Sequence, residues 1–357
     1  MQNRKLRLKL KMRISVDISD KLNYPDLLSW TKILPNRYSM ANISAISNTL
    51  QPEHSPATSP LAASITWAAS KQSYYTVRFF VDRELVQDAY RAYAYFRWMD
   101  DQLDHDGMDE PGRLAFVERQ KAIIERCYRG ERLSRLTDEE HLAADLIRRD
   151  RGENSGLQAY IRNMTAVMAF DAGRRGRLVS QQELSTYTHY LAKAVTEALH
   201  YFIGNQDKSP HNEARYLAAT AAHIAHMLRD TQEDLQAGYF NIPREYVESY
   251  RIDPGDVECA PYMNWVQSRV QLAQSYFKAG RGYLSQVENP RCRLAGHAYI
   301  ARFEYVLQAI RRDGYRLRAE YPECKSVAAG ALMSWSVLSS AFNPRQHWAR
   351  SHALPAR

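Results

Sequence analysis

Two groups of acidic residues, about 130 residues apart, have the types and the spacing to hold divalent cations. The first group is Asp100, Asp101 and Asp104 within YAYFRWMDDQLDHD, and the second is Asp230, Glu233 and Asp234 within HMLRDTQEDLQAG. If both segments are helical, carboxylates three or four residues apart lie on one helix face. Carboxylate oxygens suit Mg²⁺, which usually also binds the phosphates of a substrate. The pattern therefore predicts a magnesium-dependent diphosphate site.

Each acidic group continues a longer stripe of side chains that suits phosphate chemistry. Tyr93 and Arg97 precede the first aspartates at helical spacing. His223 and His226 precede the second group, and Arg229 stands directly before it. Arginine binds phosphate oxygens in a fixed fork, and a tyrosine can steady a leaving group. Stacked like charges cost a helix about 0.2–0.5 kcal/mol per pair, so their repetition on two helices indicates a compensating cation.

A simpler explanation exists for each of these features. A single DDxxD string is often only a solvated acidic face. Two such groups, each preceded by arginine in a mostly apolar segment, fit that explanation poorly. His223 and His226 fit packed or hydrogen-bonded histidines better than metal ligands, although His226 remains a candidate for substrate binding.

Helical periodicity runs almost without interruption from about Ser64 to Ser340. The expected helices cover residues 82–104, 112–128, 138–150, 156–170, 181–203, 212–238, 261–286 and 292–318. The segments Asp253-Pro254-Gly255 and Glu288-Asn289-Pro290 break this pattern. Alternating β-runs, GxGxxG and GxxxxGK[ST] are missing from this region, which disfavours Rossmann and P-loop domains. The prediction is an all-α fold in a single domain spanning residues 63–342.

The chain has 357 residues and a formal net charge of +8. Six of its positive charges lie within residues 4–13, so no basic face is needed elsewhere, and no nucleic-acid-binding motif is present. The four cysteines are scattered, which favours a reducing compartment over a disulfide framework or a zinc site. No run reaches the 18 or more apolar residues of a spanning helix. A cytoplasmic protein, as a monomer or weak dimer, is expected.

The two ends of the chain differ in composition from the helical region. Residues 1–62 form a basic extension and a Ser/Pro-rich linker, expected to be poorly ordered, and residues 343–357 form a tail. The uncharged stretch Ser326 to Phe342 is expected to be a buried or interfacial helix. The basic extension suits contact with an anionic membrane surface, so peripheral membrane binding remains open.

The two acidic segments together resemble the squalene/phytoene synthase family, the head-to-head prenyl transferases. The resemblance rests on YAYFRWMDDQLD and LRDTQEDLQAGYFNIP, which occur in the family's order, and it covers about residues 64–320. Weaker matches are Ser73-Tyr74, Tyr187-Thr188-His189-Tyr190-Leu191-Ala192 and Ala301-Arg302-Phe303 leading to Asp313-Gly314-Tyr315. The resemblance implies a class I isoprenoid-synthase bundle with a central cavity between two aspartate-bearing helices.

The resemblance also implies a reaction and a set of site residues. Two prenyl diphosphates, farnesyl or geranylgeranyl, would condense head to head to a squalene- or phytoene-type hydrocarbon with release of diphosphate. Two or three Mg²⁺ ions would be bound by Asp100, Asp104, Asp230 and Asp234. The other implied catalytic residues are Tyr93, Arg97, Tyr187 and Arg229. The implied substrate-binding residues are Ser73, Tyr74, Asp101, His226 and Glu233. NADPH is expected only if the product is squalene.

Several positions depart from the family pattern. Lys193 and Thr196 stand where the family has helix glycines beside the prenyl tail, which puts the shape of the tail pocket in question. His226 replaces a usual asparagine. Further departures are Tyr239, Asn241 and Phe303. The aspartates themselves are intact. The chain is therefore interpreted as a divergent member of the family.

Two other functions remain open at this stage. A head-to-tail prenyl synthase or a class I terpene cyclase also uses DDxxD, but the N-D-x-x-S-x-x-x-E pattern typical of a cyclase is not found. A non-catalytic relative that acts as an assembly factor would have broken aspartates. The departures at Lys193, Thr196 and His226 keep that reading open.

Overall fold

The computed structural model describes residues 58–105, 107–150, 152–204 and 209–322. Within these ranges the chain forms helices and connecting turns, without strands, which confirms the all-α prediction. The helices are α2 (Thr58–Ala69), α3 (Lys71–Phe80), α4 (Val86–Leu103), α5 (Glu110–Tyr128), α6 (Asp138–Arg149), α7 (Gly156–Arg174), α8 (Gln181–Phe202), α9 (Ala214–Gln236), α10 (Arg244–Tyr250), α11 (Ala260–Leu284) and α12 (Pro290–Arg312). A short 3₁₀ turn, η2 (Arg83–Leu85), precedes α4.

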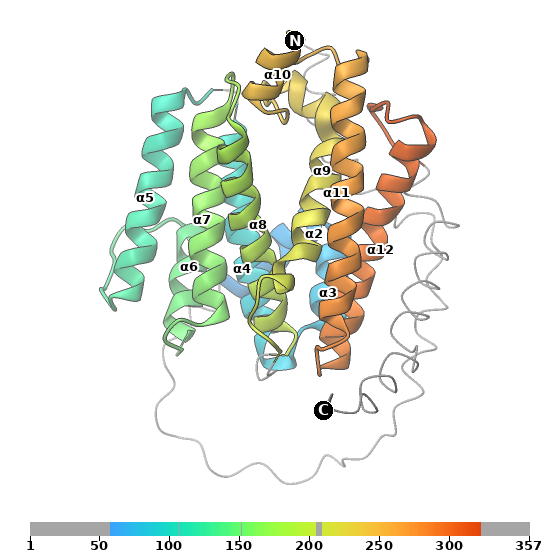
Figure 1. The fold of residues 1–357 in the computed structure, drawn as a ribbon. Coiled ribbons are helices and arrows are strands. Elements are labelled where there is room, and N and C mark those ends of the chain that lie inside the picture. Colours follow the sequence, from blue (N-terminus) through green and yellow to red (C-terminus); the bar gives the residue numbers. More distant parts are fainter. Residues whose placement is uncertain (1–57, 106, 151, 205–208, 323–357) are drawn as a thin grey trace, which may run out of the picture.

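The long helices stand side by side along one direction (Figure 1). Helix α7 packs on α8, α8 packs on α9, and α9 also packs on α11 and α12. On the other side of the bundle, α4 packs against α2 and α6 and touches α7. The two segments that carry the acidic groups, α4 and α9, therefore belong to different packing neighbourhoods.

Local sequence signals define where several helices begin. At the start of α8, the Ser180 hydroxyl accepts from the Glu183 backbone N–H, and the Glu183 carboxylate accepts from the Ser180 N–H. Thr137 and Glu140 form the same capping box at the start of α6. An N-cap of this kind stabilises a helix by about 1 kcal/mol, because it satisfies backbone donors that have no partner inside the helix.

Several helices differ from those expected from the sequence. Helix α7 continues past residue 170 to Arg174, and the short α10 was not expected. Helix α12 ends at Arg312 rather than near residue 318. The reason is local: Gly314 and Tyr315 have positive φ values of 63° and 66°, which an α-helix cannot contain.

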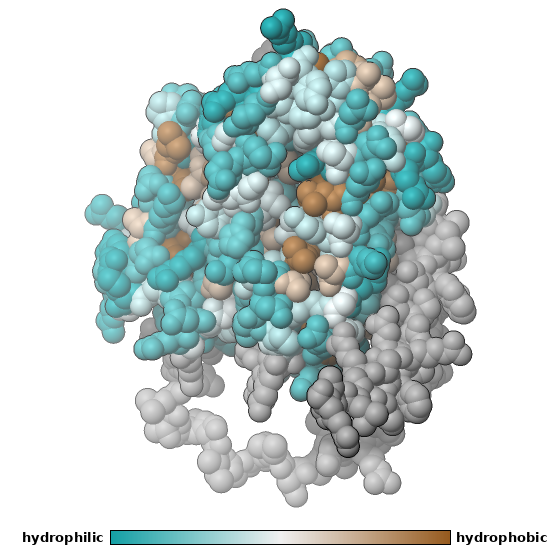
Figure 2. Space-filling view, viewed as in Figure 1, coloured by the Kyte–Doolittle hydropathy of each residue, from teal (hydrophilic) through white to brown (hydrophobic). Residues whose placement is uncertain are grey.

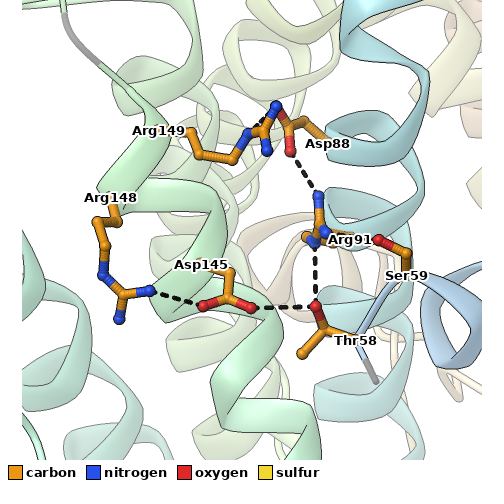
Figure 3. A network of polar contacts seen from close by, with 7 residues as sticks. All are labelled: Thr58, Ser59, Asp88, Arg91, Asp145, Arg148 and Arg149. Carbon is orange, nitrogen blue, oxygen red and sulfur yellow. Dashed lines mark hydrogen bonds and ion pairs between the residues drawn. The ribbon is translucent and has the colours of Figure 1, made fainter. Parts of the chain in front are cut away.

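Helix α2 begins at Thr58, inside the segment expected to be a linker, because polar contacts tie its first turn to the bundle (Figure 3). The Thr58 hydroxyl donates to Asp145 on α6 at 3.0 Å. Nearby, the buried carboxylate of Asp88 on α4 accepts from Arg91 at 2.8 Å and from Arg149 at 3.0 Å. This network joins α2, α4 and α6 and so helps to fix the position of α4 in the bundle.

None of the helices in the described ranges is long and apolar enough to cross a membrane. The face seen in Figure 2 is mostly hydrophilic, and its hydrophobic side chains form small separate spots. The predictions for residues 1–57, for Ser326 to Phe342 and for residues 343–357 fall outside the described residues.

Candidate active site

The first acidic group lies at the carboxyl end of α4. Asp100 and Asp101 are in its last turn, and Asp104 is its C-cap. Unpaired carbonyl groups make this end of a helix partially negative, so carboxylates here are electrostatically unfavourable. Arg97, one turn earlier, forms ion pairs with Asp100 at 3.2 Å and with Asp101. One arginine therefore pairs with two of the three carboxylates.

The remaining negative charge raises the pKa of Asp100. Close packing of atoms around this carboxyl, together with the charge of Asp104, raises its pKa to about 7 despite the opposing charge of Arg97. Asp171, from α7, adds to the same effect. The carboxylates of α4 and α7 thus repel one another across one space, and a bound cation would relieve that repulsion.

The second acidic group lies at the carboxyl end of α9. Arg229 donates two hydrogen bonds to the Asp230 carboxylate, from Nε at 2.6 Å and from Nη2 at 2.8 Å. His226 Nε2 lies 2.8 Å from the same carboxylate. Burial alone would raise the pKa of Asp230, but the hydrogen bonds from Arg229 and His226 outweigh it and hold that pKa below its ordinary value. Asp230 is therefore ionised at neutral pH.

Asp234, one turn after Asp230, has a different environment. Burial raises its pKa to about 6, against a hydrogen bond from Asn241 and with a further raising contribution from Asp230. The Asn241 amide donates to Asp234 at 2.6 Å. Asn241 follows α9 in the chain, so the loop after the helix returns to satisfy the carboxylate at its end.

Helix α7 connects the two groups. Its Asp171 forms an ion pair of 2.7 Å with Arg174, and Arg174 in turn donates to Asn241 at 3.1 Å. The Tyr187 hydroxyl, from α8, donates to Asp171 at 3.2 Å. The guanidinium of Arg174 lies 5.1 Å from the ring centre of Tyr187 and 4.8 Å from that of Tyr239. A charged and aromatic bridge thus runs from α4 to α9.

The other predicted site residues occupy different surroundings. Tyr93 is half-buried on α4, one turn before Arg97, and Glu233 on α9 is exposed. Tyr74, on α3, stacks on Tyr90 at 5.1 Å, and Ser73 lies beside it in the first turn of that helix. Tyr90 is ten residues before Asp100, which places it about 15 Å from Asp100 along the axis of α4. The role of Ser73 and Tyr74 in substrate binding stays a prediction.

The departures beside the expected tail pocket are accommodated in the core. Thr196 is buried and lines a hollow of about 40 Å³ between α8, α9, α11 and α12, with Leu199, Gly296 and Tyr299. Lys193 is half-buried on the same helix. Phe303, on α12, places its ring 6.2 Å from that of His226. A hollow of this size is far smaller than the roughly 300–1,000 Å³ of small-molecule sites.

A larger groove of about 290 Å³ opens between α8, α9 and α11. Its lining includes Leu184, Thr188, Ile224 and Leu272. Asn241, the partner of Asp234, also lines it, so the groove reaches the edge of the second acidic group. Its volume lies at the lower limit of small-molecule sites, which occupy about 300–1,000 Å³.

The donor set fits magnesium bound together with a substrate. Across the described ranges, no three carboxylate, imidazole or thiol groups converge as a preformed metal cage would require. Mg²⁺ is commonly held by one or two carboxylates, several waters and the phosphates of its substrate. Asp100 with Asp104, and Asp230 with Asp234, offer this kind of partial site.

Sequence reasoning missed Asp171, Arg174 and Asn241. A signal was present for the first two, because an aspartate and an arginine three residues apart interrupt the apolar run MTAVMAF. Because the expected helix ended at residue 170, neither Asp171 nor Arg174 was included in the predicted site. Asn241 was noted only as a departure from the family pattern, since its contact with Asp234 depends on the return of the loop.

Comparisons with known proteins agree with this arrangement. The chain is similar to a squalene synthase, HpnC, from Alicyclobacillus acidocaldarius, with 20% identity and a TM-score of 0.58 over 73% of this chain and 95% of that one. It is also similar to a dehydrosqualene synthase solved in complex with a ligand, with 16% identity and a TM-score of 0.59 over 83% and 97% of the two chains. At these identities the likeness establishes the fold, which is the all-α fold of such synthases. No curated protein sequence matches the chain. The sequence profile described as squalene/phytoene synthase matches residues 67–326, and the chain therefore belongs to the squalene/phytoene synthase family.

Proposed function

We propose that this protein is a magnesium-dependent prenyl transferase. It joins two prenyl diphosphates, farnesyl or geranylgeranyl, head to head and releases diphosphate. The observation that carries the proposal is the pairing of two aspartate groups, each with its own arginine, through the bridge of Asp171 and Arg174. Membership of the squalene/phytoene synthase family supports the same reaction.

The residues of the chain would divide the work as follows. Arg97 and Arg229 would exchange their present carboxylate partners for phosphate oxygens and bind the departing diphosphate. Mg²⁺, bound by the aspartates of α4 and α9, would supply further charge stabilisation of the leaving group. The stacked rings of Phe170 and Tyr187, 4.8 Å apart, would form part of a dry wall beside the allylic cation.

The test is an assay of purified protein with Mg²⁺ and labelled farnesyl or geranylgeranyl diphosphate, with and without NADPH. Release of diphosphate and a condensed hydrocarbon is the expected result. A product that requires NADPH would identify the squalene-type reaction, and one formed without it the phytoene-type reaction. Absence of diphosphate release from both substrates would overturn the proposal and favour a non-catalytic assembly factor.

A head-to-tail synthase or a terpene cyclase is the second candidate. The same assay separates it, because those enzymes form an elongated diphosphate or a cyclised monomer instead of a head-to-head product. The departures at Lys193, Thr196 and His226 bear on the chain length of the substrate and on metal binding. Analysis of the products determines that chain length. Binding at a membrane surface also stays a prediction.

A further inference from the structure

His223 is a buried histidine whose two ring nitrogens have no hydrogen-bond partner in the described structure. Only 6% of its surface is exposed. A buried polar atom left without a partner costs about 1–3 kcal/mol, so its presence in a native fold requires an explanation. His223 lies seven residues before Asp230 on the same face of α9, about 10 Å along the helix axis. If the diphosphates bind at the aspartates, a prenyl chain that extends along α9 would pass this position.

The groups next to His223 are already protonated or paired, so His223 is the one that can accept a proton here. Its ring meets Tyr187 edge-on at 5.1 Å. Burial raises the pKa of Tyr187 well above its ordinary value, and the hydroxyl already donates to Asp171, so this phenol keeps its proton. Asp171 is engaged by both Tyr187 and Arg174. Burial lowers the pKa of His223 to about 3, which keeps the imidazole neutral with one nitrogen lone pair free.

We propose that His223 accepts the proton lost when the two prenyl chains join. The inference rests on the proposed function and assigns its proton transfer to a residue. The C–O bond of one substrate breaks and its electron pair leaves with the diphosphate. The double bond of the second chain attacks the allylic cation and forms the new C–C bond. A C–H proton of the resulting cation passes to the imidazole nitrogen, and the C–H electron pair forms a second carbon–carbon bond between the chains. The joined chains still carry the diphosphate of the second substrate at this stage.

This step is balanced without a reductant. A C–H bond beside a carbocation is strongly acidic, so a weakly basic imidazole suffices to take its proton. An uncharged base also suits an apolar cavity, where an unpaired carboxylate would be costly. The proposal accounts for one of the two unpartnered nitrogens, the acceptor that must stay free for the substrate.

The test compares His223→Gln with His297→Gln. His297, on α12, is also buried, with 7% of its surface exposed, and lies outside the candidate site. Labelled prenyl diphosphate and Mg²⁺ are supplied, and condensed product, released diphosphate and monomeric prenyl alcohol are measured. His223→Gln is expected to lower condensed product about 100-fold. Diphosphate release should fall far less, because the cation still forms and water captures it as the alcohol. His297→Gln should keep the wild-type ratio of product to diphosphate.

A second variant separates chemistry from packing. His223→Ala is expected to recover condensed product when imidazole is added, with folding monitored by circular dichroism. An unchanged ratio of condensed product to diphosphate in His223→Gln, or no rescue of a folded His223→Ala, would overturn the assignment while leaving the proposed function intact. Absence of diphosphate release by the wild-type protein would overturn both.

Discussion

Arg174 on α7 and Asn241 in the loop after α9 are joined by a hydrogen bond of 3.1 Å. Asn241 also donates to Asp234, and Arg174 also pairs with Asp171. Asp171 in turn raises the pKa of Asp100. The electrostatic state of one acidic group is therefore connected to that of the other through α7, although the two groups lie on helices of different packing neighbourhoods.

Substitution of Arg174 is expected to damage both stability and activity. Arg174→Gln removes one partner of a largely buried ion pair and leaves Asp171 uncompensated, which should destabilise the fold by about 3–5 kcal/mol. Urea denaturation measures this change. Arg177→Gln is the matched control, because Arg177 is exposed and pairs with Glu183 at the surface. Equal stability of the two variants would show that the bridge is unimportant.

The aspartates are expected to be essential for turnover and dispensable for folding. Asp100→Ala and Asp230→Ala should each abolish diphosphate release, because each removes a carboxylate from a proposed Mg²⁺ site. Circular dichroism should show unchanged helical content, since both side chains lie at helix ends. Glu118→Ala, which alters an exposed pair with Lys121, is the control. Full activity in either aspartate variant would contradict the site.

The raised carboxyl pKa values predict a specific pH dependence of stability. Burial raises the pKa of Asp100 to about 7 and that of Asp234 to about 6, from 3.8 for a free aspartate. The folded state therefore holds more protons, and the stability contributed by these groups is lost as pH rises from about 4 to 7. Melting temperatures of the wild type and of Asp100→Asn/Asp234→Asn, without divalent ions, should converge at low pH and separate above pH 6.

Magnesium should reverse this loss. Because Mg²⁺ binds the deprotonated carboxylates, it should raise the melting temperature at pH 8 more than at pH 5. The double asparagine variant should show no such difference. A magnesium effect of equal size at both pH values would mean that the ion binds elsewhere.

Gly280 and Gly282 on α11 should respond oppositely to alanine. A Cβ at Gly280 would lie 2.7 Å from the Cβ of Ala218 on α9, so Gly280→Ala must push the two helices apart. The expected loss is about 1–3 kcal/mol. At Gly282 a Cβ would meet no heavy atom within 4 Å, and alanine should stabilise the helix by up to about 1 kcal/mol. Thermal unfolding of the two variants tests the contact, and a stable Gly280→Ala protein would refute it.

The sequence predicted the parts of the site that repeat along one helix. The spacing within each acidic group predicted the helices α4 and α9, and the all-α fold and the family are confirmed. The roles of the aspartates and of the preceding arginines stay predictions. The sequence did not predict which side chains contact one another between helices. The Arg174–Asn241 bond joins residues 67 positions apart, and no periodicity encodes such a pair. The stacking of Tyr74 on Tyr90 likewise depends on how α3 packs.

The position of α7 between the two packing neighbourhoods makes it the spacer of the site. Helix α4 is held by α2 and α6, and α9 is held by α8, α11 and α12, while α7 touches both α4 and α8. We expect the span between the two acidic groups to depend on the packing of α7 as well as on the aspartates themselves. Larger or smaller side chains on α7 should therefore change that span while every carboxylate stays in place.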